Sequence, residues 1–416
     1  MVICRKELLY ALVICLGPFN HGNIAIYPSP TAGEIRAIHH LKENALEWSF
    51  YNGVVSLTAI VGPFLTEFLL RLYKNSRKKT IFTLAVASSI FWLFNLITKV
   101  SIWAGIAARA LLGFTLGGFS ALSPVFLVEI APKGETGFYG TMNMFSLVLA
   151  TCIINFLGPH LNYLQLSIYA SCIPLIQSIF IWFIPDTKKN DDDDGNLEKQ
   201  ETKKENLFQK KYAKGLLIGL LMMFFQQMCG VNAIITNLVD LMKSSGLNFD
   251  PCYQAGIAQL SQLFAIFIGG TLVDKLGRKI VWMISTMIVT IFLLLFALNT
   301  KFEWSNILPL VSIFVYKFGF GLGLGPIPWY IVPEYFDYNV RALANEIVSA
   351  VNWAFAFIII FTWPLMKESL GMFGSFLLFM VITFISFLFG LFVVTEPKQI
   401  MNTKDTLSES LIADNF

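Results

Sequence analysis

Three amide side chains stand close together in an otherwise apolar run, at Gln226, Gln227 and Asn232. An amide donates and accepts hydrogen bonds from one neutral group, so a set of amides suits a ligand that carries many hydroxyl groups. A sugar is such a ligand, and its apolar ring face needs an aromatic surface such as tryptophan. A helix break near Gly230 would help Gln226 and Asn232 to point to one cavity. The alternative is that these amides only join neighbouring helices in lipid.

A second stretch, Lys317–Arg341, is apolar but holds four glycines and three prolines. A continuous helix does not tolerate so many breakers, because proline removes a backbone donor and clashes with the preceding turn. In lipid the freed backbone groups must face protein or a water-filled cavity. We therefore expect a broken membrane helix that lines a cavity, bends at Trp329, and ends in a charged pair, Glu334 with Arg341. Discontinuous helices of this kind mark transporter binding sites.

The composition requires a membrane around these elements. The 416 residues are 56% hydrophobic and 14% charged, with a mean hydropathy of +0.64. Apolar runs of about 20 residues are long enough to cross a bilayer. We predict an all-α polytopic membrane protein with twelve spans, at residues 7–27, 48–70, 79–98, 101–127, 138–158, 162–184, 212–242, 253–273, 280–299, 306–332, 342–366 and 371–395.

The polar segments between these runs set the orientation and the division of the chain. Most lysines and arginines fall in loops that share one side if both termini are cytoplasmic, as the positive-inside rule favours. The longest internal polar stretch, 186–211, separates six spans in 1–185 from six spans in 212–416. Its acidic run Asp191–Asp194 is typical of a solvated linker, so no metal site is expected. The net charge of +3 indicates no nucleic-acid partner.

The two halves share a motif. The joint between the eighth and ninth spans reads GTLVDKLGRK over 270–279, and the matching joint in the first half reads LLRLYKNSRK over 69–78. The first copy keeps the basic end but lacks the glycines and the aspartate. The six cysteines show neither a pairing pattern nor a metal-ligand spacing. No nucleophile–base arrangement and no phosphate loop is present, so an enzyme is not expected.

These motifs, taken together, resemble the sugar-porter branch of the major facilitator superfamily, and the resemblance covers nearly the whole chain. The resemblance implies two six-helix bundles that alternate access to a sugar, without a cofactor. We expect the chain to function as a monomer and take the plasma membrane as its default location, although the sequence does not distinguish it from an internal membrane. The motifs that carry the resemblance are GTLVDKLGRK, RALLGFTLGGFSALSPVFLVEIAPK from Arg109, QQMCGVNA from Gln226, GPIPWYIVPEYF with Arg341, VNW from Val351, and the closing tags PDTK and TEPK.

By the same resemblance, Trp329, Asn352 and Gln262 join the three amides of the seventh span around the sugar. The chain also departs from the family pattern. A span-5 glutamine is replaced by Met144, a tyrosine pair by Thr236 and Asn237, and an acid before the span-10 glycines by Gly321. A hexose remains the expected substrate, although these changes leave the preferred sugar open.

Charged residues near the cytoplasmic ends are expected to form a gate. The candidates are Arg77, Glu129, Asp274, Arg278, Glu334 and Arg341, and Arg109 within the fourth span is counted with them. In the first half, Tyr73 replaces the family's aspartate and Thr136 replaces an arginine. Fewer inner pairs weaken the outward-open state, which predicts an inward-open bias.

The coupling mode follows from the first and fourth spans. Proton-coupled relatives place an aspartate near the span-4 arginine, whereas this chain has Asn20 near Arg109. Because an asparagine does not titrate, we expect facilitated uniport. Proton–sugar symport is an alternative, because histidine titrates near neutral pH and His21 lies in the first span. A non-transporting sugar sensor is another, because the first-half motif lacks residues that the second-half motif has. Lys317 lies within the tenth span and either snorkels outward or faces the cavity.

Overall fold

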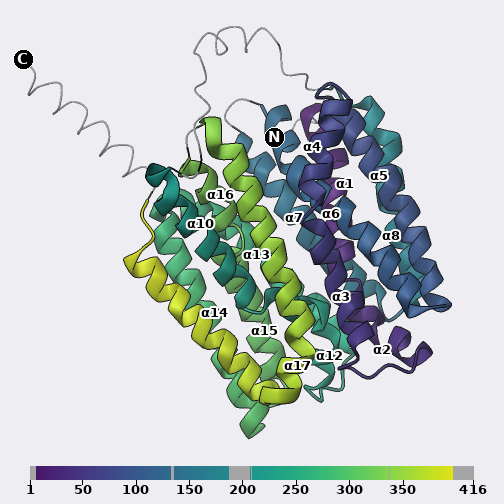
Figure 1. Cartoon of the computed structure of the whole chain (residues 1–416). Coiled ribbons are helices and arrows are strands. Elements are labelled where there is room, and N and C mark those ends of the chain that lie inside the picture. The colour runs from purple at the N-terminus through teal and green to yellow at the C-terminus, as the bar shows by residue number, and fades with distance from the viewer. Residues whose placement is uncertain (1–5, 133–134, 187–206, 208, 337, 397–416) are drawn as a thin grey trace, which may run out of the picture.

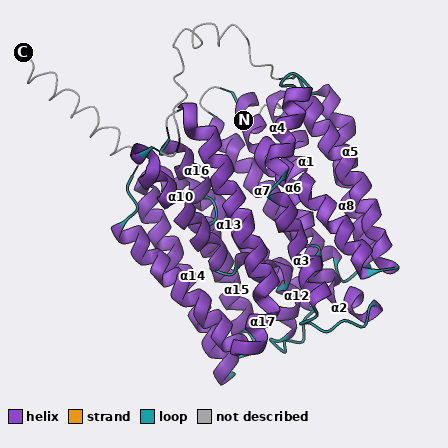
Figure 2. Cartoon of the chain, viewed as in Figure 1, coloured by secondary structure: helices purple, strands orange, loops and turns teal. Residues whose placement is uncertain are grey.

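The structure is a computed structural model that describes residues 6–132, 135–186, 207, 209–336 and 338–396. Within these residues every regular element is a helix (Figure 2). Ten helices are long and apolar enough to cross a membrane, and the bent pair α3 and α4 forms one further candidate span. The prediction of an all-α membrane protein is therefore confirmed.

The helices of the first half run in chain order from the N-terminal end. Their bounds are α1 (Lys6–Ile26), α2 (Pro28–Ile38), α3 (Leu46–Ala59), α4 (Gly62–Leu72), α5 (Arg77–Phe94), η1 (Asn95–Lys99), α6 (Ile102–Ile130), α7 (Thr136–Leu157), α8 (Tyr163–Phe180) and η2 (Ile181–Phe183).

The second half contains more breaks. Its elements are α10 (Lys210–Met228), α11 (Val231–Thr236), α12 (Leu238–Lys243), α13 (Pro251–Leu276), α14 (Arg278–Phe302), α15 (Leu308–Gly319), the π-helical η3 (Phe320–Leu324), α16 (Ile327–Glu334) and α17 (Tyr338–Phe392). The membrane candidate within α17 covers 50 residues, or about 75 Å of helix, far more than one crossing. It breaks at Gly371, where φ is 66°, so α17 contains both of the last two predicted spans.

Other predicted elements differ from the observed ones. The second span bends by 42° between α3 and α4. A Cβ on Gly62 would lie 2.5 Å from the Cα of Gly117, so the bend brings α4 directly against α6. The segment between the first two predicted spans, residues 28–47, begins with helix α2. Cys252, which lies between the predicted spans 212–242 and 253–273, is in the first turn of α13.

The bend of the tenth span was predicted at the wrong residue. The chain leaves α-helical geometry at η3 and restarts after Gly325–Pro326, so Trp329 lies inside α16. The backbone N–H of Gly325 donates to the Phe320 carbonyl five residues earlier. This wider turn is a π-bulge, which occurs often at functional sites. The predicted break itself is confirmed.

Each half has a hydrophobic cluster of its own, and two further clusters join the halves, one through Trp353 and Ala356 and one between Val148, Cys152, Leu263 and Ile266. One hydrophobic cluster, from Leu207 to Val394, contains second-half residues alone, and another, from Ala11 to Ile184, contains first-half residues alone. The division at residues 185 and 212 stays a prediction, because most of the linker and all of Asp191–Asp194 lie outside the described residues.

The molecule has two chemically distinct ends (Figure 1). We call one the basic end: it holds the basic turns between α4 and α5 and between α13 and α14. We call the other the far end: it holds α2 and α12, which contact each other across the two halves.

Candidate functional site

Four predicted amides meet in one hydrogen-bonded network. Gln227 donates from Nε2 to Asn352 Oδ1 at 3.0 Å and accepts at Oε1 from Asn232 Nδ2 at 2.6 Å. Asn352 donates from Nδ2 to Gln226 Oε1 at 2.7 Å. The residues come from the end of α10, from α11 and from α17, so the network joins three helices. Gln226, Gln227 and Asn352 are buried.

The helix break at Gly230 brings these amides together, as the sequence predicted. Gly230 has a φ of 83°, which disfavours any side chain. A Cβ there would also lie 2.4 Å from the ring of Phe379. Glycine therefore ends α10 and lets α11 start in a new direction, which carries Asn232 back to Gln227.

The second helix break supplies the network with backbone acceptors. Gln226 donates from Nε2 to the carbonyl oxygens of Leu324, at 3.3 Å, and Gly325. These carbonyls are freed where η3 ends. The two broken helices are thus connected by one glutamine, which satisfies backbone groups that lipid could not.

The structure does not bring Gln262 and Trp329 into this network. Gln262 is buried on α13 beside Gly321, where an added Cβ would meet Gln262 Cγ at 2.9 Å. A side chain at position 321 would therefore need Gln262 or Ala265 to shift in this conformation. Trp329 is partly buried and packs against the second-half core. In the described part of the chain, neither side chain makes a hydrogen bond to the four amides.

The surroundings of Arg109 are aromatic and amide-rich. Arg109 is 1% exposed, donates from one terminal nitrogen to the Ile24 carbonyl at 2.8 Å, and lies over the rings of Tyr27 and Tyr51 at 5.9 and 5.6 Å. Among the described residues no carboxylate pairs with it. The arginine is held by a carbonyl and ring faces, in place of an acid.

Asn20 and His21 on α1 make contacts of their own. Asn20 donates to Ser88 Oγ and accepts from Trp92 Nε1, both at 2.8 Å. The ring of His21 lies 5.6 Å from the ring of Trp353. Asn20 therefore joins helix α1 to helix α5 by two hydrogen bonds.

Lys317 does not snorkel outward, because its side chain is 0% exposed. Its ammonium nitrogen has no hydrogen-bond partner among the described residues. Of the two alternatives that the sequence left open, the outward one is wrong.

Each half carries one arginine–glutamate pair at the basic end. Arg77 on α5 pairs with Glu129 on α6, and Arg278 on α14 pairs with Glu334 on α16 at 2.7 Å. Both pairs lie within their own half. The first-half motif has therefore lost its aspartate but kept this pair.

The closing tags repeat the same symmetry. Asp186 accepts from the backbone N–H of Lys78 at 3.3 Å, and Glu396 accepts from that of Lys279 at 2.7 Å. Each acid thus binds the start of the third span of its half, where the helix dipole favours a negative charge.

Two predicted gate residues are placed differently. Arg341 donates to the Phe336 carbonyl at 3.2 and 3.3 Å, while Glu334 pairs with Arg278. The expected Glu334–Arg341 pair is wrong for this conformation. Asp274 belongs to neither arginine–glutamate pair in the part of the chain that the structure describes.

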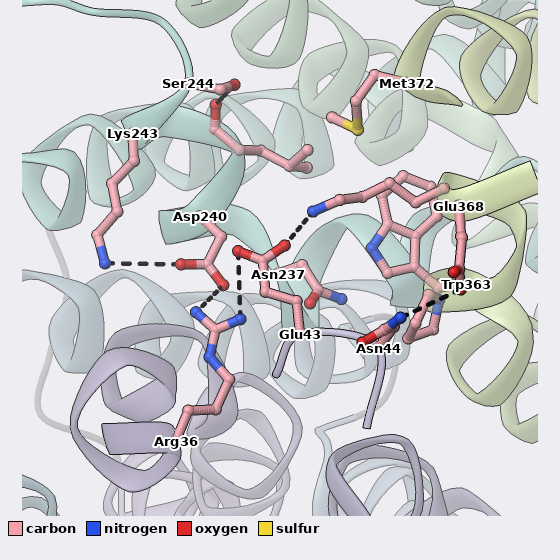
Figure 3. A pocket seen from close by; sticks show the side chains of 13 residues that line it. Arg36, Glu43, Asn44, Asn237, Asp240, Lys243, Ser244, Trp363, Glu368 and Met372 are labelled. Carbon is pink, nitrogen blue, oxygen red and sulfur yellow. Dashed lines mark hydrogen bonds and ion pairs between the residues drawn. The ribbon is translucent and has the colours of Figure 1, made fainter. Parts of the chain in front are cut away.

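At the far end, charged residues bridge the halves. Arg36 pairs with Asp240 across the halves at 2.8 Å and with Glu43 of its own half at 3.4 Å. Glu43 also pairs with Lys367, and Asp240 with Lys243 at 3.6 Å. We call this series the far-end ion chain (Figure 3). Burial opposes ionisation of Glu43, but Lys367 and Arg36 together lower the pKa of its carboxyl below the ordinary value.

The far-end ion chain was not predicted from the sequence. Its residues come from four separate segments, and no motif or spacing joins them. The signal available in the sequence was the group of charged residues between the first two predicted spans, which includes Arg36, Lys42 and Glu43. A cavity of about 560 Å³ opens beside the ion chain.

Comparison with protein families identifies the chain. A model described as "Sugar (and other) transporter" matches residues 25–401. The chain belongs to this family of sugar transporters. The family match agrees with the paired broken helices and with the amides between them.

Known relatives and solved structures agree on the fold. A facilitated trehalose transporter, Tret1, from Polypedilum vanderplanki is 29% identical, with 94% of this chain and 86% of that protein covered. Its counterpart from Apis mellifera ligustica is 27% identical, over 94% and 86%. A crystal structure of a D-xylose-proton symporter superposes with a TM-score of 0.82, at 19% identity, over 94% of this chain and 99% of that chain. The sugar transporter's fold is therefore that of the major facilitator superfamily.

Proposed function

We propose that this sugar transporter carries a neutral sugar down its gradient by facilitated uniport, and that the four amides bind the sugar. The observation that carries this proposal is the network of Gln226, Gln227, Asn232 and Asn352 between two helix breaks. Each amide has donors and acceptors in one neutral group, so sugar hydroxyls can replace the contacts that the amides make with one another. Trp329 and Gln262 are proposed to complete the site in a conformation with sugar bound.

Movement between two states follows from the charge pairs. Several hydrogen bonds and ion pairs join the two halves at the far end, including Arg36 with Asp240 and Lys367 with Glu43. The pairs at the basic end stay within their halves. We infer that the basic end is cytoplasmic and the far end external. The far-end pairs hold the two halves together on the outer side, and this closure supports the expected inward-open bias.

Uniport is favoured by the neutral surroundings of Arg109. A proton-coupled carrier needs a group that gains and loses a proton near this position, and Asn20 cannot do so. The buried arginine instead interacts with the Ile24 carbonyl and with Tyr27 and Tyr51. Symport through His21 is the alternative, and it predicts that a protonophore abolishes uptake.

The sugar itself is proposed from two lines of reasoning. The sequence resemblance favours a hexose, while the relatives that are named as trehalose transporters favour a disaccharide. The smaller side chains Thr236 and Asn237 at the outer end of α11 are compatible with the larger molecule. Glucose and trehalose are therefore the two substrates that separate these proposals.

The experiment is uptake of labelled glucose, fructose, xylose and trehalose into cells that lack their own sugar carriers, with and without a protonophore. Uptake of one of them that survives the protonophore supports uniport. Surface labelling of the same cells checks the proposed plasma-membrane location and cytoplasmic termini. A protein that reaches the surface, binds sugar and moves none would be a sensor.

A further inference from the structure

The far-end cavity has walls from both halves. Figure 3 shows Arg36 and Glu43 from the first half facing Asn237 and Asp240 from the second. Its volume of about 560 Å³ lies within the usual range of small-molecule sites. The remaining polar lining consists of Asn44, Lys243, Ser244, Lys367 and Glu368.

The lining has the chemistry that a sugar requires. Asp240 and Glu368 offer carboxylate oxygens, Asn44 and Asn237 offer amides, and Trp363 belongs to the apolar part of the wall. Asn44 donates to Glu368 at 3.2 Å. A carboxylate has about four acceptor positions, so these groups keep capacity for hydroxyl donors while the ion chain stays formed.

The cavity also coincides with a departure from the family pattern. Asn237 stands at one of the two positions where the family pattern has a tyrosine. Its side chain donates to the Ala233 carbonyl at 2.9 Å within its own helix turn. A short side chain that is hydrogen-bonded to its own helix does not fill the cavity beside the end of α11.

We propose that this cavity is a second binding site for the transported sugar, reached from the outside and separate from the four amides. This inference rests on the proposed function. A sugar held there touches both halves only while the far end is closed, so its binding favours the closed state. High external sugar is therefore expected to slow its own entry.

The test is equilibrium binding of radiolabelled glucose and trehalose to the purified full chain, with three variants. Gln227→Leu removes a central amide, Glu368→Gln removes a cavity carboxylate, and Glu303→Gln is the control, since Glu303 is a far-end carboxylate outside the cavity lining. Ser244→Ala provides a second cavity variant on an exposed side chain, in case Glu368→Gln fails to fold.

The expected result is two bound sugars per chain. Gln227→Leu should abolish one, Glu368→Gln should weaken the other by about tenfold, as expected for a hydrogen bond to a charged group, and Glu303→Gln should change neither. A single site that Gln227→Leu removes and the cavity variants leave unchanged overturns this inference and leaves the proposed function intact. No bound sugar at all overturns both.

Discussion

Removing the Arg36–Asp240 pair should open the far end. The two side chains are 12% and 14% exposed, and they join the halves at 2.8 Å. Breaking an exposed ion pair costs about 0.2–1 kcal/mol, and breaking a buried one about 3–5 kcal/mol. For this largely buried pair we expect about 2 kcal/mol from Arg36→Met, which is a roughly 30-fold shift toward the outer-open state.

The assay is a distance measurement between spin labels at positions 42 and 301, on opposite halves of the far end, with Cys4, Cys172 and Cys252 replaced by serine. Arg36→Met and Asp240→Leu should each increase the population with the longer distance. The shift in free energy toward the outer-open state should be smaller in the double variant than the sum of the shifts in the two single variants. The reason is that the second substitution no longer breaks an ion pair. The control is Arg71→Met, which removes an exposed pair with Glu67 inside one helix. Unchanged distances, or strictly additive effects, would refute the bridging role of the far-end ion chain.

Four further outcomes are expected. Asn352→Ala should lower sugar uptake at least tenfold while surface expression stays unchanged, since it removes the amide shared by Gln226 and Gln227; uptake near the original level would contradict the binding role. Gly230→Ala should lower thermal stability by about 1–3 kcal/mol, measured by unfolding in detergent, because the residue has a positive φ and meets Phe379; equal stability would exclude this strain. Ionised Glu43 should stabilise the closed far end above pH 4.5, and this contribution should be lost as the pH falls through the lowered pKa of its carboxyl. In the spin-label assay, Glu43→Gln should abolish this pH dependence of the closed population. Asn20→Ala should destabilise the protein without making uptake sensitive to a protonophore, and a newly acquired sensitivity would contradict its structural role.

The sequence was sufficient for much of the fold because lipid leaves few alternatives. Apolar length identified the crossing segments, and the breakers at Gly230 and at Gly325–Pro326 identified two helices that could not be continuous. The position of the second bend was wrong, because nothing local distinguishes a π-helical turn at Gly321–Leu324 from a simple break at Trp329. The geometry depends on the packing of α15 against α13 and α14.

The site was predicted unevenly for a similar reason. Gln226, Gln227 and Asn232 share one motif, and the structure brings them together with Asn352. The partner of Glu334 depends on which arginine is nearest in three dimensions, and Arg278 is favoured over Arg341 in this conformation. The far-end ion chain was not foreseen, because Arg36 and Glu43 of the first half meet Asp240 and Lys367 of the second half only when the two halves close.

The central claim is that the four amides bind a sugar which the protein then moves down its gradient. The most direct test is uptake of labelled glucose or trehalose into liposomes that contain only the purified protein, without a pH gradient or membrane potential, compared with Gln227→Leu and Asn352→Ala. We predict saturable uptake of one of these sugars by the original protein and at least tenfold less by both variants. No uptake until a proton gradient is imposed, or equal uptake by the variants, would contradict the account.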